Sequence, residues 1–262
     1  MPNLRVKDPA SWRLINQLLV RDGGQWRTCK SQWVYSGGAW RKTFGNAGTG
    51  NLTLTAGSGS ITVPAGVYSL ALKLVGGGAG GGSCGSQSGD PQTAYGCGAG
   101  GSGAVALWTQ AVTPGQVISY TVAAAAAGNT NGNATKITIN GITYTVGGGI
   151  HGVQTPVGSG AQGGAEDTTT RGAGGAVGTV PSGATTFAGA FGLGGVRGFS
   201  GSGGAGGSTP TGVGTGGWNG SYPSTAATAG TGYGAGGGGA GGYSGASPTG
   251  GAGAPGVITI TY

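Results

Sequence analysis

The sequence predicts a mostly β and irregular fold, in which a small antiparallel β platform continues into packed glycine-rich helices of the polyproline-II type. Glycine supplies 69 of the 262 residues, and it is concentrated in blocks that recur from residue 76 to the C-terminus. Segments with the apolar–polar alternation of strands frame these blocks. Inserts of unrelated composition separate the blocks. A uniform scaffold that holds variable surface loops is therefore predicted.

Disordered and collagen-like chains are also glycine-rich, and the composition disfavours both. Charged residues make up only 6% of the chain, whereas disordered chains combine low hydrophobicity with high charge. Collagen needs an unbroken G-X-Y register, which the Gly-Gly pairs of the blocks interrupt. Helices without side chains can approach until their backbones hydrogen-bond, and dense bonding must then offset the entropy that glycine loses on ordering. The blocks cover residues 76–82, 96–103, 158–165, 171–178, 192–198, 201–207 and 234–242.

Residues 1–44 are predicted to form an attachment head that begins with one short helix at residues 8–20. Asp8 suits the N-cap of this helix and Pro9 its first position. Gly23 and Gly24 follow and end it. The apolar side chains share one face at helical spacing: Trp12, Ile15, Leu18 and Leu19.

Residues 23–44 are predicted to form a short β-meander that turns at Gly-Gly pairs. The segment contains a near-repeat, GGQWRT and GGAWRK, that places Trp26 and Trp40 fourteen residues apart with Trp33 midway. Four of the six tryptophans thus lie in the first 40 residues, beside most of the positive charge. So small a segment cannot bury them within itself. They form either a partner surface, which we favour, or a contact with the glycine-rich domain.

A linker at residues 45–51 is expected to lead into one glycine-rich domain at residues 52–262. Alternation and turn signals predict the strands of its platform, with Asn140-Gly141 as the clearest hairpin turn. No further strand is expected between residue 147 and the last strand. The predicted strands are 52–55, 60–63, 67–75, 104–112, 117–123, 135–140, 142–146 and 257–262.

The inserts between glycine blocks have the composition of binding loops. One lies between residues 82 and 96, and the others cover 150–157, 166–170, 179–188, 208–231 and 243–249. They collect Ser, Thr, Asn and Pro with isolated aromatic residues, a mixture in which aromatic rings anchor a partner and small polar groups adjust to it. The alternative is that aromatics such as Phe187 and Trp218 cover the platform edges. The candidate binding residues are Tyr95, His151, Glu166, Asp167, Phe187, Trp218, Asn219, Tyr222 and Tyr243.

The net charge of +7 does not indicate a nucleic-acid-binding protein. Eight of the twelve Lys and Arg residues lie in the first 44 positions, which leaves the large domain nearly neutral. No signal peptide is apparent and no apolar run is long enough to cross a membrane. The three cysteines are too few for a disulfide framework. Cys84 and Cys97 could bridge the first insert, but free thiols in a reducing cytosol are the favoured expectation.

No enzyme, cofactor or metal centre is expected. GxGxxG occurs three times, as chance allows in so glycine-rich a chain, and no helix follows to face a phosphate. His151 is the only histidine, so a metal site built on several histidines is impossible. The neighbouring Glu166 and Asp167 occupy a polar insert and suit a solvated tip or a receptor contact better than a glycosidase pair.

Four runs resemble the glycine-rich domain of phage tail-fibre proteins. They are ITVPAGV at residues 61–67, KLVGGGAGGG at 73–82, VTPGQ at 112–116 and GAPGVITI at 253–260. The whole layout, a Trp-rich head followed by glycine motifs that alternate with dissimilar segments, resembles the distal long-tail-fibre adhesins of T-even-type phages. The resemblance covers essentially the full chain, and it depends on the order of the motifs more than on any single one.

The resemblance implies a polyglycine-II sandwich at the tip of the virion's long tail fibre, in a protein made in the host cytoplasm. Its head would dock on the distal fibre trimer, and its loops would bind an outer-membrane protein or lipopolysaccharide of the host, without nucleic acid and without membrane insertion. The residues expected to attach to the fibre are Trp12, Ile15, Leu19, Trp26, Trp33 and Trp40. A structural or ice-binding polyglycine-II protein is the alternative, which the irregular inserts disfavour.

Overall fold

The computed structural model describes residues 5–8, 11–14, 19–22, 25–28, 31–36, 39–45, 49–83, 95–153, 170–194, 206–212, 214–217, 226–242 and 248–262. For residues before 49 and for Tyr95 it describes the backbone alone. The described part contains strands and extended segments but no α-helix. The mostly β fold with antiparallel sheets is confirmed.

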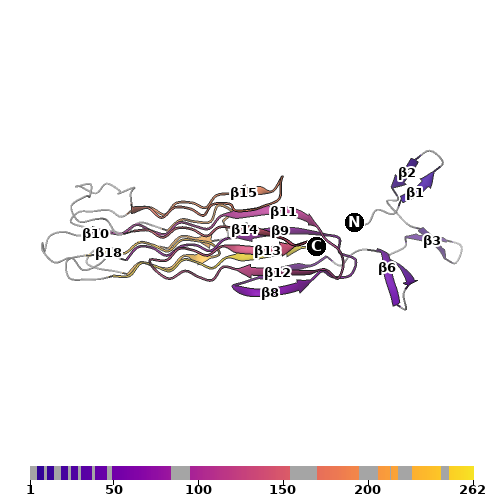
Figure 1. The fold of residues 1–262 in the computed structure, drawn as a ribbon, viewed down its shortest axis with the longest axis horizontal. Coiled ribbons are helices and arrows are strands. Elements are labelled where there is room, and N and C mark those ends of the chain that lie inside the picture. Colours follow the sequence, from indigo (N-terminus) through magenta and orange to yellow (C-terminus); the bar gives the residue numbers. More distant parts are fainter. Residues whose placement is uncertain are drawn as a thin grey trace.

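Two antiparallel sheets form the platform at one end of a long body (Figure 1). The five-stranded sheet has the order β15-β11-β9-β19-β7, with β15 at Thr185–Phe187, β11 at Val105–Ala111, β9 at Ser69–Val75, β19 at Val257–Thr261 and β7 at Asn51–Leu54. The four-stranded sheet has the order β14-β13-β12-β8, with β14 at Ile142–Val146, β13 at Thr135–Ile139, β12 at Val117–Val122 and β8 at Gly57–Thr62.

The hydrophobic core of the platform draws on both sheets. Leu70, Leu72 and Leu74 of β9 are buried, while Ala71 between them is exposed, as the period of two requires. Residues of β12 and β13 belong to the same buried cluster. The rings of Trp108 and Tyr144 connect β11 with β14 at a centroid distance of 5.3 Å. Lys73, on the other face of β9, is half-buried, and this burial lowers the pKa of its amine.

Thr135, the first residue of β13, connects the four-stranded sheet with the end of β9 in the five-stranded sheet through buried hydrogen bonds. Its hydroxyl donates to the carbonyl oxygen of Val75 over 2.7 Å and accepts the N–H of Ala123 over 3.2 Å. The side chain is fully buried. These bonds fix the strand ends at which the glycine-rich segment after Val75 and the alanine-rich segment from Ala123 begin.

We expect Thr135→Val to lower the melting temperature by about 5–10 °C. The change preserves shape but leaves a buried N–H and carbonyl without their partner, which costs roughly 2–3 kcal/mol. The control is Thr138→Val in the same strand, since the Thr138 hydroxyl bonds only to that of Thr143 on the more exposed face. Equal melting temperatures for the two variants in a thermal denaturation series would contradict this role.

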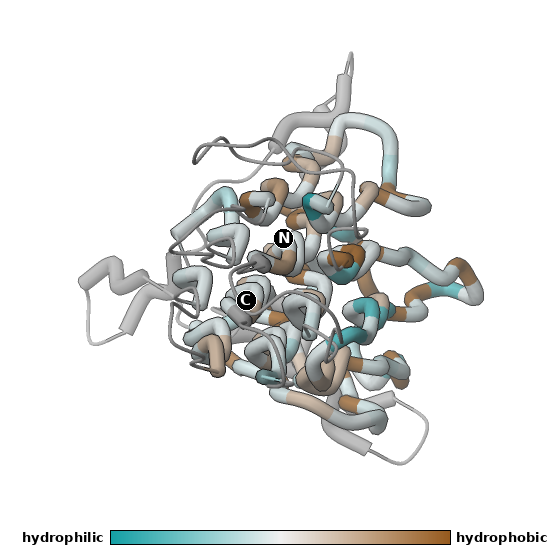
Figure 2. Tube along the Cα trace, turned by 90° about the vertical axis from the view of Figure 1, so that its left-hand side faces the viewer, coloured by the Kyte–Doolittle hydropathy of each residue, from teal (hydrophilic) through white to brown (hydrophobic). Residues whose placement is uncertain are grey.

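The glycine-rich segments extend from the strand ends and run side by side along the long axis of the body (Figure 1). Figure 2 looks along this axis, so that the segments appear as separate pale coils. Hydrogen bonds join different segments: Gly78 N–H donates to Ala254, Gly81 N–H to Gly251 and Ala79 N–H to Gly101. Every residue from 76 to 82 is buried, although none is larger than alanine.

Short two-residue strands occur among these segments. β10 (Tyr95–Gly96) pairs with β18 (Gly241–Gly242), and β16 (Gly214–Thr215) pairs with β17 (Thr231–Gly232). β15 is a further strand that the sequence did not predict, because TTF lies within the expected insert 179–188. Its pairing with β11 adds this segment to the edge of the five-stranded sheet.

The predicted helix at residues 8–20 is wrong, because the described part of the head consists of three hairpins. β1 (Arg5–Asp8) pairs with β2 (Ser11–Leu14), β3 (Leu19–Asp22) with β4 (Gln25–Thr28), and β5 (Ser31–Ser36) with β6 (Ala39–Gly45). Each pair is a separate two-stranded sheet, so β4 and β5 do not form the expected continuous meander.

The three hairpins repeat every fourteen residues. Trp12, Trp26 and Trp40 occupy the same register position, opposite Lys7, Arg21 and Tyr35 respectively. In each hairpin the next residue is an Arg, and it lies opposite a Val. The sequence did not reveal the first repeat, because Pro9-Ala10 stands where the other two repeats have Gly-Gly, and Asp8-Pro9 imitates a helix start. The apolar residues at helical spacing extend from the first hairpin, with Trp12 in β2, to the second, with Leu19 in β3.

Candidate functional site

Five connections between glycine-rich segments leave the described body at one end, which we call the distal end. Residues 83, 153, 194, 217 and 242 are the last described before these connections. Backbone hydrogen bonds join the segments close to these residues. Cys97 N–H donates to Ala240, Gly98 N–H to Val153, Ala99 N–H to Leu193 and Ala227 N–H to Thr249. Figure 1 shows β10 and β18 at this end, far from the platform. The bases of the connections therefore lie side by side.

A sixth distal connection is described completely, and it is not among the inserts predicted from the sequence. It is the turn at residues 127–131, with the sequence AGNTN. Asn129 adopts the left-handed conformation, with φ of 59°, which asparagine tolerates better than most residues. Its N–H donates to Gly81, and its side-chain oxygen accepts the N–H of Ser83 over 2.7 Å. The signal in the sequence is this Asn-rich stretch between two extended segments.

His151 is the predicted binding residue whose side chain the structure places near the distal end. Its backbone N–H donates to Asn131 Oδ1 over 2.9 Å, so it lies beside the 127–131 turn. Its ring Nδ1 lies 2.9 Å from the carbonyl oxygen of Gly152. A carbonyl only accepts, so this bond calls for a proton on Nδ1, and in the neutral ring Nε2 is then an acceptor.

The other predicted binding residues are distributed differently. Tyr95 begins β10 at the distal end, where its backbone pairs with Gly242. Phe187 lies in β15 opposite Val105, at the edge of the platform sheet, and it is 39% exposed. The structure therefore does not bring Phe187 to the distal end. The remaining candidates lie outside the described residues: Glu166, Asp167, Trp218, Asn219, Tyr222 and Tyr243.

Five of the six residues expected to attach to the fibre lie in the N-terminal hairpins. Trp12 is in β2, Leu19 in β3, Trp26 in β4, Trp33 in β5 and Trp40 in β6, whereas Ile15 lies outside the described residues. The hairpin backbone brings Trp12, Trp26 and Trp40 into equivalent positions, and Trp33 occupies a different one.

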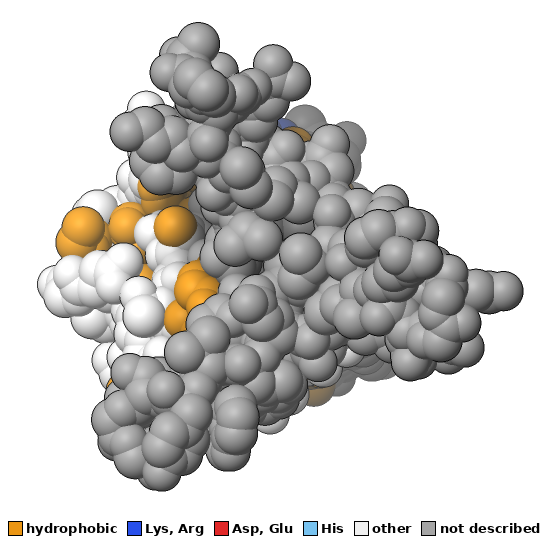
Figure 3. Space-filling model, turned by 90° about the vertical axis from the view of Figure 1, so that its right-hand side faces the viewer, with side chains coloured by type: hydrophobic (Ala, Val, Ile, Leu, Met, Phe, Trp, Pro, Cys, Tyr) orange, Lys and Arg blue, Asp and Glu red, His pale blue; other side chains and the backbone are white. Residues whose placement is uncertain are grey.

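The platform faces the hairpin side of the molecule in Figure 1. The part of this face that Figure 3 shows in colour carries hydrophobic side chains and hardly any charged ones. Val117, 64% exposed, and Ile142, 52% exposed, begin β12 and β14. Ile142 follows directly on the Asn140-Gly141 turn, and Val117 comes one residue after the Pro114-Gly115 turn.

The expectation that Cys97 carries a free thiol is wrong, because the structure has it disulfide-bonded. Its partner lies outside the described residues. Free thiols were expected from the cellular compartment, whereas a disulfide forms where two cysteines lie close together. Cys97 is fully buried directly after β10, and its N–H bonds to Ala240, so its position at the base of the first insert is fixed.

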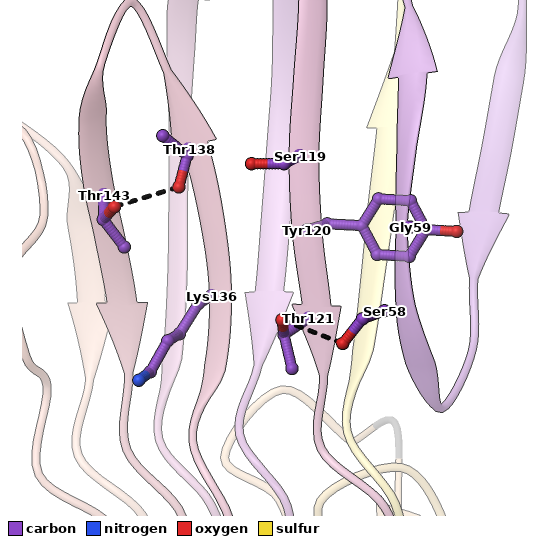
Figure 4. Close-up of a pocket in the computed structure, with 8 residues that line it drawn as sticks. All are labelled: Ser58, Gly59, Ser119, Tyr120, Thr121, Lys136, Thr138 and Thr143. Atoms are coloured by element: carbon purple, nitrogen blue, oxygen red, sulfur yellow. Dashed lines mark hydrogen bonds between the residues drawn. The ribbon is translucent and has the colours of Figure 1, made fainter.

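A shallow hollow on the outer face of the four-stranded sheet is lined mainly by hydroxyl groups (Figure 4). Two pairs of these groups bond to each other, Ser58 to Thr121 and Thr138 to Thr143. Lys136 is the only charged residue of the lining, and the Tyr120 ring lies over Gly59. The lining has no carboxylate, imidazole or thiol.

The described residues contain no helix that could cross a membrane and no group of three His, Cys, Asp or Glu side chains that could hold a metal ion. No protein-family model matches this chain, and no curated protein matches it either.

Proposed function

We propose that this chain is the adhesin at the tip of a phage long tail fibre. Its hairpins dock on the distal fibre trimer, and its distal loops bind a receptor in the outer membrane of a Gram-negative host. The observation that carries the proposal is the division of the chain into two unlike ends. Repeated hairpins lie at one end, connections of unrelated sequence leave the other, and a hydrogen-bonded body lies between them.

The fourteen-residue repeat supports docking on a trimer. A homotrimer presents the same surface three times around its axis. A single chain can bind all three subunits in the same way only if it carries three equivalent binding surfaces. Trp12, Trp26 and Trp40 provide them, each on its own hairpin at the same register position. Each is followed by an Arg, and Trp with Arg is a frequent composition of binding hot spots.

The hydrogen bonds of the body support the finer fold, a sandwich of polyglycine-II helices. The N–H donors of residues 97–104 change partner segment with a period of three, as a helix with three residues per turn requires. Residues 97, 100 and 103 donate to 240, 237 and 234; residues 98, 101 and 104 donate to 153, 150 and 147; residues 99 and 102 donate to 193 and 190. Each segment can thereby be held by several neighbours at once.

The backbone hydrogen bonds between segments explain how the body can carry variable loops. The hydrogen bonds that hold it are made by backbone groups within the segments. Connections at the distal end can change length and side chains without removing those bonds, as surface loops generally can. The long 208–231 insert carries Trp218 and Tyr222, four residues apart, which suit the aromatic anchors of a binding loop.

The receptor-binding role is tested by changing Trp218 and Tyr222 together to Ala. We expect adsorption to host cells to fall at least tenfold, since loss of a hot-spot aromatic costs roughly 2–4 kcal/mol. The melting temperature should stay within about 2 °C of the parent's, as for surface changes. Unchanged adsorption, or a large fall in melting temperature, would assign the two rings to the scaffold.

A further inference from the structure

Three positions carry the same residue in all three hairpin repeats: a valine, the tryptophan, and the arginine that follows the tryptophan. Every other aligned position of the hairpins differs in at least one repeat. In each hairpin the arginine lies directly opposite the valine. Since the repeats differ elsewhere, these positions meet a requirement that all three hairpins share. The valines are Val6, Val20 and Val34, and the arginines are Arg13, Arg27 and Arg41.

The tryptophan and the arginine belong to opposite faces of each hairpin. Successive residues of a strand alternate between the two faces of a sheet, and Trp12 directly precedes Arg13 in β2. On the tryptophan face the opposite residue is Lys7, Arg21 or Tyr35, and a cation or an aromatic ring is a favourable neighbour for a tryptophan. On the other face the arginine is opposite a valine, which has neither a charge nor a hydrogen-bonding group. The strand pairing therefore gives the tryptophan a suitable neighbour and leaves the arginine without an ionic one.

The chain has too few acidic residues beside the hairpins to explain the three arginines. Residues 1–44 hold eight Lys and Arg residues but only two acids, Asp8 and Asp22. The two aspartates share one register position, and the third hairpin has Ser36 there. An ion pair with this aspartate is therefore not what the three repeats have in common. The three remaining acids of the chain belong to inserts of the glycine-rich domain, and the described parts of that domain contain none.

We infer that Arg13, Arg27 and Arg41 bind three equivalent carboxylates, one on each subunit of the fibre trimer. A guanidinium group presents its N–H donors in a planar fork that matches a carboxylate, to which it can donate two parallel hydrogen bonds. A homotrimer repeats every surface carboxylate three times around its axis, and each hairpin supplies one arginine at the same register position. This inference rests on the proposed docking and adds the chemistry that the trimer presents: one acidic group per subunit beside the contact for the tryptophan.

Arg41→Gln and Lys42→Gln remove the same charge from neighbouring positions of β6, and only the first of these positions is identical in all three repeats. We expect Arg41→Gln to weaken retention of the full-length chain on purified fibre trimers about tenfold, because it removes charge-assisted hydrogen bonds. Lys42→Gln should change retention less than about twofold, as an exposed charge outside such a pair does. Changing all three arginines to Gln should abolish retention. Changing all three to Lys keeps the charge but not the fork, so it should restore part of the retention.

Modifying the partner tests the same pairs with the parent chain, so this measurement does not depend on the folding of any variant. Fibre trimers whose carboxylates have been converted to amides, and which remain trimeric, should no longer retain the parent chain. Retention on unmodified trimers should also weaken as salt rises, because salt screens the charges. Equal retention of the Arg41→Gln and Lys42→Gln variants, or undiminished retention of the parent on amidated trimers, overturns the inference alone. Failure of the parent chain to bind unmodified trimers overturns the proposed docking and this inference with it.

Discussion

Gly78→Ala will abolish folding of the glycine-rich body, although it adds a single methyl group. A Cβ at this position would lie far inside contact distance of the Ala235 carbonyl and close to that of Gly234. Backbone atoms of a neighbouring segment cannot swing aside as a side chain can. The Gly78 N–H also donates to Ala254, so moving the segment breaks this buried bond. Steric and unpaired-backbone costs of about 2–4 kcal/mol each approach the stability of a whole domain.

The measurement is the yield of soluble protein and its thermal unfolding. Gly115→Ala is the matched control: its Cβ meets nothing within 4 Å, and only its φ of +81° opposes the change. Strain at that turn should cost about 1–2 kcal/mol and leave the protein folded. Ala79, the next residue after Gly78, already carries a fully buried methyl group, so the prediction is specific to the position. A soluble Gly78→Ala protein that melts like the parent would contradict close packing of the segments.

Replacing Trp12, Trp26 and Trp40 together by Ala will abolish retention of the chain on fibre tips. Each ring is expected to contribute as a hot spot, and three losses of roughly 2–4 kcal/mol would remove most of a stable association. The platform and glycine-rich body should melt as in the parent, because the hairpins are sheets separate from both. Co-purification with fibre trimers measures retention.

The equivalence of the three positions gives this prediction a sharper form. Each single variant should weaken retention to a similar degree, because each Trp occupies the same register position in its hairpin. Trp33→Ala lies outside the repeat and provides the comparison. A triple variant that still co-purifies with the fibre, or a fall in the melting temperature of the body, would place the rings in an internal core.

Local patterns in the sequence were sufficient for the platform. The alternation in SLALKLV predicted β9 with its buried leucines, and Asn140-Gly141 predicted the turn between β13 and β14. These features depend on side-chain period and on the backbone conformations that Asn and Gly allow. The glycine blocks likewise indicated segments packed without side chains. In each case the information lies within about ten consecutive residues.

Local patterns failed where two different structures share one pattern. Trp12, Ile15 and Leu19 fit a helix face, yet fourteen-residue hairpin repeats place Trp12 in β2 and Leu19 in β3. A proline after an aspartate starts many helices, but Asp8 here ends β1. The strand residues 185–187 and the 127–131 turn also went unrecognised. Their order depends on neighbours such as β11, Gly81 and His151, which are distant in the sequence.

The sequence by itself determined the kinds of segment in this protein: strands that alternate, glycine blocks without side chains, and inserts that vary. Only the tertiary structure decided which segments are neighbours. One glycine block is nearly identical to another, so nothing local directs the N–H of Gly78 to Ala254, 176 residues away. Which segments become neighbours depends on the positions of the platform strands from which they extend. The tertiary structure also places the connections together at the distal end, because segments that run back and forth between two ends must turn there.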